Sequence, residues 1–447
     1  MESFDVVVVG ARCAGSPLAT MLARRGLKVC VLDRAHFPSE TPSTHMIQSC
    51  GVDVLHDLGV LDTLMSAGAA PLHAATIAND DVQIHATVDA RTEHPVLCAR
   101  RVTLDVLLVE AAGAAGAEIR TGTRVNGLLR DRDRVTGVRT DKGTIGARLV
   151  VGADGRHSTV ADAVGAQEYD VTQPGRMVAW GYFEGVDRAG LARFGRMKDM
   201  GYLAGPTDGD LYMAAIAPDQ SRANEFQADR DIFFTNAIRK WPELADLMAD
   251  AKRVGPLRVF TKWHGYFRQS AGPGWVLVGD AGHFKDFTPG QGISDALRQA
   301  KQLADGIEHG LAGDGLDDAM QQWSHWRDHD AYEMYWYAAR MGAPGPASPW
   351  TNALLHEVSA SPAATRAFIR VLNHDMPPSK LYTPTMALRA TARAIREHPR
   401  HTPATVKEFI STARQGIKQA RRKRRLADRT RIMNREPDWG TAVAHSR

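Results

Sequence analysis

Glycine-rich turns that follow apolar runs contain the residues best suited to chemistry in this chain. The first turn, Gly10-Ala-Arg-Cys-Ala-Gly15, follows the run Phe-Asp-Val-Val-Val-Val at 4–9. It keeps the first and third glycines of GxGxxG, with Arg12 at the middle position. Gly10 permits a tight turn, and Gly15 lets a helix pack closely on a strand. The helix N-terminus would then offer N–H groups to a pyrophosphate, so the turn predicts nucleotide binding.

The elements around this turn are those that a dinucleotide fingerprint requires. Residues 4–9 predict a buried parallel strand, residues 14–25 a helix and residues 28–32 a second strand. Asp33 ends that strand, 23 residues after Gly10, where it can accept hydrogen bonds from a ribose. A long side chain at position 12 can point away from the phosphates or pair with them, and the sequence leaves both possibilities open.

Two later turns also follow apolar strands, and each contains Gly and Asp. Residues 149–158 place Asp154 between Gly152 and Gly155. Residues 275–283 place Asp280 at a strand exit, and Pro289-Gly-Gln-Gly-Ile293 then leads into a helix at 294–307. Such turns are common singly, but three in this order indicate one nucleotide-binding unit assembled from separated segments. A second GxGxxG and a redox CxxC are both absent from the sequence.

Together the motifs resemble the FAD-dependent monooxygenases of the para-hydroxybenzoate hydroxylase type, the group A flavoprotein monooxygenases. Geranylgeranyl reductases and flavin halogenases are relatives of that family, and the resemblance spans about residues 4–310. It implies an α/β fold with a Rossmann-like FAD-binding domain, an inserted β-sheet substrate domain and a helical C-terminal region. It also implies FAD as cofactor, NAD(P)H as a transient co-substrate, and O2.

The same resemblance implies roles for single residues. Asp33 matches the acid that holds the adenosine ribose, Arg101 a position near the pyrophosphate, and Asp280 the acid that binds the ribityl chain. Residues 289–293 match the segment beside the flavin pyrimidine ring, where a helix N-terminus stabilises negative charge on reduced flavin. The predicted cofactor-binding residues are Gly10, Arg12, Gly15, Asp33, Arg34, Arg101, Asp154, Gly155, Gly279, Asp280, Pro289, Gly290, Gln291, Gly292 and Ile293.

Three reactions fit a flavin in such a site, and the sequence favours one of them. Flavin halogenases carry Trp-x-Trp-x-Ile-Pro and a catalytic Lys, neither of which is found here. Geranylgeranyl reductases carry a Tyr-x-Trp-x-Phe-Pro-like segment, whereas the nearest stretch, residues 201–206, lacks the Trp and the Phe. We therefore expect hydroxylation or epoxidation of a small aromatic or apolar substrate through a flavin C4a-hydroperoxide. A flavin-dependent ene-reductase and a non-catalytic flavin-binding module remain alternatives.

Candidate substrate and catalytic residues come from the middle of the chain and from two histidines. Strand-like composition at 177–183, 210–216 and 258–263 predicts the substrate-facing sheet. The candidate pocket-wall residues are Trp180, Tyr202, Tyr212 and Trp263, with ordinary core packing as the alternative for each. The candidate catalytic residues are His45 and His283, which would act as a general base or position the flavin. Arg100 and Lys285 are interpreted as solvated charges, and no metal site is predicted.

The predicted domain boundaries follow from these motifs. Residues 1–75, 98–171 and 272–330 form the FAD-binding domain, residues 76–97 and 172–271 the substrate domain, and residues 331–447 the helical C-terminal region. Helices are predicted at 294–310, 317–340, 351–373 and 384–435, broken by prolines. Six aromatic residues at 323–337 indicate either a buried packing stripe or a roof over the substrate.

Composition and charge exclude several classes of protein. Of the 447 residues, 44% are apolar and 24% charged, which is typical of a globular protein. Residues 414–435 carry ten Lys or Arg and one Asp, a net charge of +9 within a chain of net charge +4. We interpret this run as a solvated helix face rather than a contact with lipid or nucleic acid. Short apolar runs and four cysteines without CxxC predict a cytoplasmic protein with no integral membrane association.

Overall fold

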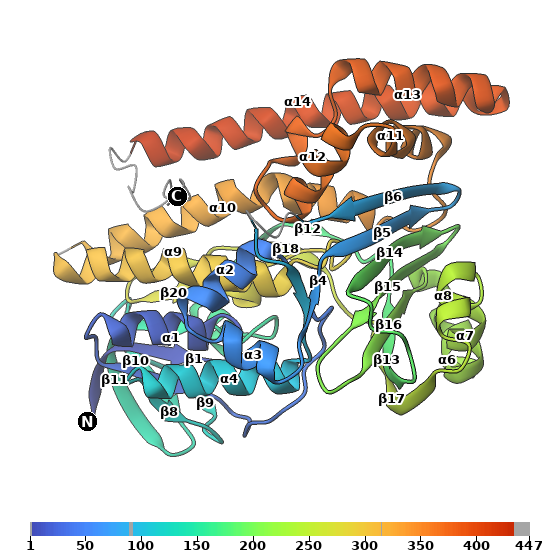
Figure 1. The fold of residues 1–447 in the computed structure, drawn as a ribbon. Helices are drawn as coiled ribbons and strands as arrows, with labels where there is room; N and C mark the ends of the chain where they lie inside the picture. Colours follow the sequence, from blue (N-terminus) through green and yellow to red (C-terminus); the bar gives the residue numbers. More distant parts are fainter. Residues whose placement is uncertain (1, 89–92, 314, 433–447) are drawn as a thin grey trace.

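The computed structural model describes residues 2–88, 93–313 and 315–432. Two large sheets lie in separate halves of the molecule, and long helices cover them (Figure 1). The first sheet has the order β19-β20-β11-β1-β2-β8. Its strands are β1 (Ser3–Val9), β2 (Val29–Leu32), β8 (Glu118–Arg120), β11 (Gly143–Gly152), β19 (Ala271–Gly272) and β20 (Trp275–Leu277). An antiparallel pair, β9 (Val125–Asp131) and β10 (Arg134–Thr140), extends from β11. The predicted α/β class is confirmed.

The parallel strands of this sheet bring the predicted turns to one edge. β1 pairs in parallel with β2 and β11, and β11 pairs in parallel with β20. The side chains of Val6, Val7 and Val8 are fully buried, as expected of a parallel strand that is covered on both faces. Because carboxyl ends of parallel strands meet at one edge, the turns after β1, β11 and β20 converge there. Helices α1 (Gly15–Arg24), α4 (Arg101–Ala114) and α9 (Gly292–Ala312) pack beside the sheet.

The second sheet has the order β17-β13-β16-β15-β14-β5-β6. Its strands are β5 (Ala74–Asn79), β6 (Val82–Thr87), β13 (Val178–Glu184), β14 (Leu191–Met197), β15 (Met200–Pro206), β16 (Tyr212–Ala217) and β17 (Lys252–Phe260). Helices α6 (Ala223–Ala228), α7 (Arg230–Ile238) and α8 (Pro242–Leu247) cover one face (Figure 1). Because β5 pairs in parallel with β14, residues from both predicted substrate segments form one sheet. On this basis we propose the boundaries given above, with residues 76–97 and 172–271 in the substrate domain. Within the first of these segments, residues 89–92 lie outside the described residues.

One predicted strand in this sheet has the wrong bounds. The strand expected at 258–263 ends at Phe260, as part of β17. The chain then leaves the sheet because Trp263 is held elsewhere. Its indole N–H donates to the carbonyl of Arg176 at 2.9 Å, and its ring packs on Phe284 and Phe287.

Smaller elements complete the body of the molecule. One small sheet contains β3 (Met46–Ile47), β4 (Ala70–Leu72) and β7 (Val96–Cys98), and another β12 (Glu168–Thr172), β18 (Gly265–Arg268) and β21 (His283–Phe284). The short helices are α2 (Ser49–Asp57), α3 (Leu61–Ser66) and α5 (Thr159–Val164). All four cysteines are free thiols.

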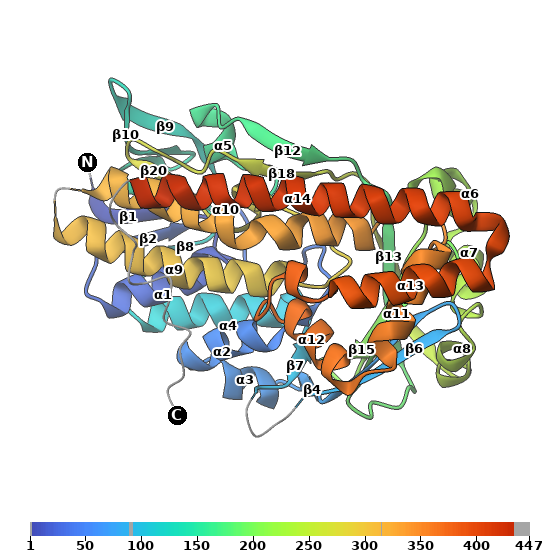
Figure 2. The same cartoon turned by 90° about the horizontal axis from the view of Figure 1, so that it is seen from above.

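The C-terminal region is a layer of helices on the outside of both halves. It contains α10 (Leu316–Met341), α11 (Pro349–Ser359), α12 (Pro362–Leu372), α13 (Pro384–Glu397) and α14 (Thr402–Ile432). Seen from above, α14 crosses the molecule over α10, with α13 beside it (Figure 2). Among the described residues, no helix is both long enough and apolar enough to cross a bilayer.

Two predicted C-terminal helices are broken where proline cannot continue them. The helix expected at 351–373 splits at Pro362, and the Ser361 hydroxyl accepts a hydrogen bond from the Ala364 N–H to cap α12. The helical region expected at 384–435 is interrupted at 398–401, around Pro399, in agreement with the proline breaks predicted there; residues 433–435 lie outside the described residues.

Buried ion pairs and a hydrogen bond join this region to the body. Lys285 Nζ lies 2.5 Å from Asp295 Oδ2, and Asp295 Oδ1 lies 3.3 Å from His374 Nδ1. His374 Nε2 lies 3.5 Å from Asp330, which also pairs with Arg298 at 3.0 Å. We call these five residues the charge chain. In addition, the side-chain amide of Gln291 donates to the carbonyl of Leu372 at 2.6 Å.

Candidate active site

A large cavity of about 570 Å³ lies at the edge where the strand-end turns converge. Most of the residues predicted to bind the cofactor line it. These are Gly10, Arg12, Asp33, Arg34, Arg101, Asp154, Gly155, Gly279, Asp280, Gly292 and Ile293. Four others do not lie on its wall: Gly15, Pro289, Gly290 and Gln291.

The first turn has the close packing that its glycines predict. Gly10 has φ +104°, and a Cβ there would lie 2.4 Å from the Ala153 carbonyl oxygen. A Cβ on Gly15 would lie 1.8 Å from the Gly10 carbonyl oxygen, so Gly15 serves packing rather than the cavity wall. Asp33 accepts hydrogen bonds from the N–H groups of Ala11 and Ala35, both at 2.8 Å. The carboxylate is therefore fixed beside the turn.

Arg12 and Arg101 converge on one buried carboxylate, Asp105. The guanidinium of Arg12 donates to Asp105 Oδ2 at 2.9 Å and to Ser39 Oγ at 2.8 Å. Arg101 Nε donates to Asp105 Oδ1, also at 2.9 Å. The arginine at the middle fingerprint position is thus held at the cavity wall by an acid from α4. Sequence reasoning missed Asp105, although its position four residues after Arg101 is the spacing of a helical ion pair.

The two remaining strand-end acids have different surroundings. Asp154 accepts from the Ser158 hydroxyl at 2.5 Å and from the Thr159 N–H at 2.7 Å, so it also caps α5. Burial raises the pKa of Asp280 to about 6, although Arg101 and Arg156 oppose that shift. Asp280 makes no side-chain hydrogen bond to the described residues, and its carboxylate faces the large cavity. A carboxylate in that position can accept hydrogen bonds from ligand hydroxyls.

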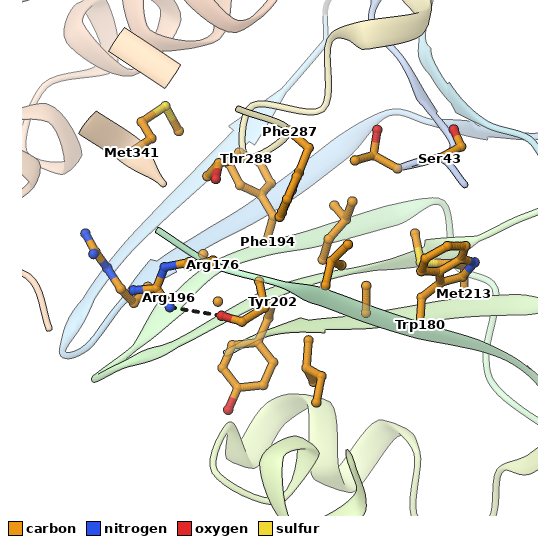
Figure 3. Close-up of a pocket in the computed structure, with 18 residues that line it drawn as sticks. Ser43, Arg176, Trp180, Phe194, Arg196, Tyr202, Met213, Phe287, Thr288 and Met341 are labelled. Carbon is orange, nitrogen blue, oxygen red and sulfur yellow. Dashed lines mark hydrogen bonds between the residues drawn. The ribbon is translucent and has the colours of Figure 1, made fainter. Parts of the chain in front are cut away.

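An apolar pocket of about 70 Å³ adjoins the large cavity. The two share the lining residues Ser43, Thr44, Val178, Trp180 and Phe287. Trp180 and Met213 lie at one end of the pocket, Arg176 and Arg196 at the other, and Phe194 lies between them (Figure 3). Both guanidiniums donate to the carbonyls of Ala343 and Gly345, so they secure the loop that follows α10.

The donors and acceptors of the large cavity fit a dinucleotide with a polyol chain: arginines and a helix N-terminus for phosphates, and carboxylates for hydroxyls. A family model described as "FAD binding domain" matches residues 3–335. The chain belongs to this FAD-binding family. This family is of the group A flavoprotein monooxygenase type, and FAD is the cofactor of this chain.

Curated relatives of this FAD-binding protein match parts of the chain. Rifampicin monooxygenase of Streptomyces venezuelae is 33% identical over 36% of this chain and 34% of its own length. Conditioned medium factor receptor 1 of Dictyostelium discoideum is 26% identical over 67% of this chain and 62% of its own. The chain thus spans between about a third and three fifths of these relatives. Digeranylgeranylglycerophospholipid reductase 1 of Methanococcoides burtonii is 26% identical over 72% of this chain and 78% of its own length.

Solved structures share the fold of this FAD-binding protein. The flavin-dependent brominase Bmp2 superposes with a TM-score of 0.72 at 18% identity, covering 89% of this chain and 99% of its own. PqsL of Pseudomonas aeruginosa, described as a probable FAD-dependent monooxygenase, superposes with a TM-score of 0.63 at 20% identity. The match covers 82% of this chain and 99% of the PqsL chain.

Of the four candidate pocket-wall residues, the structure places two on the apolar pocket. Trp180 lies on the walls of both the pocket and the large cavity. Tyr202 lines the pocket, but its hydroxyl donates away from it to the Ala237 carbonyl at 2.7 Å. Tyr212 and Trp263 lie outside both walls, in the sheet core and beside Phe287. The six aromatic residues at 323–337 also lie off the pocket wall, which favours packing over a roof.

The two candidate histidines are both buried and neutral. His45 has φ 64°, and its Nε2 lies 2.7 Å from the Tyr182 hydroxyl. Burial lowers the pKa of His45 to about 3, and this residue does not line the large cavity. His283 does line it, burial lowers its pKa well below the usual value, and its Nε2 has no hydrogen-bond partner among the described residues.

Lys285 and Arg100 are not solvated charges, contrary to our expectation. Lys285 is buried on the wall of the large cavity, where it pairs with Asp295. Arg100 is paired with the fully buried Asp208, at 2.9 Å. Ion pairing makes the burial of Lys285 possible, whereas the Arg100 side chain is held by its pair and stays 25% exposed.

Proposed function

We propose that this protein is an NAD(P)H- and O2-dependent FAD monooxygenase that hydroxylates or epoxidises a small aromatic or apolar molecule. The observation that carries the proposal is the apolar pocket, which shares a wall with the large cavity and is lined chiefly by apolar side chains. When bound, FAD would supply the redox chemistry, taking two electrons from NAD(P)H and activating O2, which provides the oxygen atom that is transferred. A substrate in this pocket would lie beside the cofactor and away from bulk water.

The chain's own residues would hold the cofactor through the contacts described above. We assign the pyrophosphate to Arg12, Arg101 and the N-terminus of α1, because these supply positive charge at the cavity wall. Asp33 would accept from the adenosine ribose, and Asp280 from the ribityl chain. Gly292 and Ile293 place the N-terminus of α9 on the same wall.

The substrate would lie between aromatic side chains from different elements. Trp180 of β13, Phe194 of β14 and Phe287 of the loop before α9 line the apolar pocket. Ring faces of this kind suit a flat or apolar molecule, and the exclusion of water protects an activated oxygen from loss.

His45 would act as a positioning residue rather than as a base. A histidine with a pKa near 3 stays neutral at physiological pH and is a weak proton acceptor. Its hydrogen bond to Tyr182 holds the chain at 43–45, and Ser43 and Thr44 line both the pocket and the large cavity. Of the two histidines only His283 lines the large cavity, so we propose it as the one nearer to the bound flavin, with its buried Nε2 turned away from the ligand space.

The test is stopped-flow absorbance of the FAD-loaded protein, reduced anaerobically and mixed with O2. We expect a transient species that absorbs at shorter wavelength than oxidised flavin, and faster NAD(P)H oxidation with some members of a panel of aromatic compounds. Direct return to oxidised flavin without a transient would contradict the proposal and favour an ene-reductase. Stable FAD binding without NAD(P)H oxidation would favour a non-catalytic module.

A further inference from the structure

The outer face of α14 exposes apolar side chains where a solvated helix would be polar. Val406, Ile410 and Ile417 are 38%, 41% and 55% exposed. Of the seven large apolar side chains that are exposed in the described part of the chain, these three and Leu388 lie on α13 and α14. Exposed apolar side chains that form a contiguous patch mark an interaction site.

These residues form a continuous row along the helix. Val406, Ile410, Ala413, Ile417 and Ala420 follow one another at intervals of four and three residues, which places them on one side of an α-helix. All five are exposed, whereas Thr405, about 100° around the helix from the row, is buried. We call these five residues the α14 row. Figure 2 shows that α14 is an outermost element, with no other part of the described chain lying over it.

Positive charges that form no ion pair with a described residue lie beside the α14 row. Residues 384–425 contain twelve Lys or Arg and two Glu, a net charge of +10. Arg422 and Lys423 are bound to the body through Asp170 and Glu333. Six others on α14 are exposed and form no ion pair with a described residue: Lys407, Arg414, Lys418, Arg421, Arg424 and Arg425.

We propose that α14 docks the protein on an anionic lipid surface, with the α14 row inserted at the headgroup boundary and its basic neighbours against lipid phosphates. This replaces our interpretation of the basic run as a solvated helix face, which took no account of the apolar row beside it. An apolar row with Lys and Arg around it is the composition of helices that lie in a membrane interface. A second copy of this chain fits less well, because pairing two α14 rows would bring the same basic residues together. A nucleic acid would leave the α14 row without a partner, since basic side chains alone bind its phosphates. The proposal does not depend on the reaction.

The experiment is vesicle flotation of the FAD-loaded full chain. The vesicles are phosphatidylcholine alone, or phosphatidylcholine with about 40% phosphatidylglycerol. The second composition carries enough negative charge to bind basic residues. We expect flotation with anionic vesicles only, and its loss in high salt, because salt screens surface charge. No flotation with anionic vesicles, or equal flotation with neutral ones, would overturn the proposal.

Matched variants separate the two components of the surface. Ile410→Gln/Ile417→Gln should lower the partition coefficient about tenfold or more, since it removes two apolar side chains from the interface. Arg421→Gln/Arg424→Gln/Arg425→Gln should lower it roughly a hundredfold, at about fivefold for each charge near an anionic surface. The controls are Ile232→Gln on α7, which is also exposed, and Arg239→Gln/Lys240→Gln/Lys252→Gln. Each control should float like the parent protein.

Other partners give different outcomes in the same set. If Ile410→Gln/Ile417→Gln floats like the parent while the triple arginine variant no longer floats, binding is purely electrostatic. Insertion of the α14 row is then refuted. If the parent forms a dimer without vesicles and Ile410→Gln/Ile417→Gln is a monomer by analytical ultracentrifugation, the row is a self-interface and the proposal fails. Flavin absorbance and circular dichroism verify that each variant is folded.

Discussion

Replacement of Asp105 by Asn tests the arrangement of charge beside the cofactor. The Asp105 side chain has no exposure and is the shared acceptor of Arg12 and Arg101, each at 2.9 Å. It also accepts a weak hydrogen bond from the Cys13 thiol at 3.4 Å. The substitution keeps the shape of the side chain but removes its charge, so that two cations remain beside a neutral group.

The expected loss of stability follows from this geometry. Removing one partner of a buried ion pair costs about 3–5 kcal/mol. Asn retains a carbonyl oxygen that accepts from one arginine, and Arg12 is 24% exposed, so water stabilises part of its charge. We therefore expect Asp105→Asn to lower the free energy of unfolding of the FAD-free protein by about 2–3 kcal/mol.

Urea unfolding monitored by circular dichroism measures this loss. Asp187→Asn is the control, because Asp187 is exposed and makes no ion pair with the described residues; it should change stability by less than about 0.5 kcal/mol. Saturating FAD should reduce the loss in Asp105→Asn, since a pyrophosphate supplies the missing negative charge. Equal stability of Asp105→Asn and Asp187→Asn would refute the reasoning, and a loss unchanged by FAD would refute the phosphate assignment.

Three further predictions concern pH, the cofactor and the pocket. Because burial lowers the pKa of His45 to about 3, the unfolded chain takes up its proton first as pH falls. Acidification from pH 6.5 to 5 should then cost up to about 2 kcal/mol through this residue, and urea unfolding should show a weaker pH dependence in His45→Gln. The pKa of Asp280 is raised to about 6, so its stabilising contribution is lost as pH rises from 4 to 6. Asp280→Asn should therefore stabilise the FAD-free protein by about 1–3 kcal/mol at pH 7, yet weaken FAD binding roughly tenfold or more by calorimetry; undiminished affinity would remove Asp280 from the site. Tyr202→Phe should cost about 1 kcal/mol of stability and leave KM unchanged, whereas Trp180→Ala should raise KM roughly tenfold; the reverse pattern in steady-state assays would misplace the pocket.

The sequence was most informative where structure depends on neighbouring residues. An apolar run that ends in Gly or Asp is a local signal, and the four runs before Gly10, Asp33, Asp154 and Asp280 had to meet because parallel strands end at one edge. Asp33, Asp154 and Asp280 were therefore predictable as a group, and all three line the large cavity. Gly15 was also predicted to serve helix packing. The structure agrees, because a Cβ at this position would collide with the Gly10 carbonyl oxygen.

Predictions failed where a residue's position depends on contacts distant in sequence. Asp105 approaches Arg12 only because α4 packs against α1. Tyr212 and Trp180 are both aromatic residues on neighbouring strands, but strand register decides which face each side chain occupies. Phe194 and Met341 reach the apolar pocket from elements that the sequence did not place together.

The charge chain determines how this protein could be recombined with its relatives. A chimera with its crossover near residue 330 would take Lys285, Asp295 and Arg298 from one parent and His374 from the other. Asp295 would then keep Lys285 but depend on the other parent for its second buried partner, at position 374. Functional chimeras should therefore inherit residues 285–375 from a single parent, so that the cofactor-side helix and the C-terminal helices are exchanged as one block.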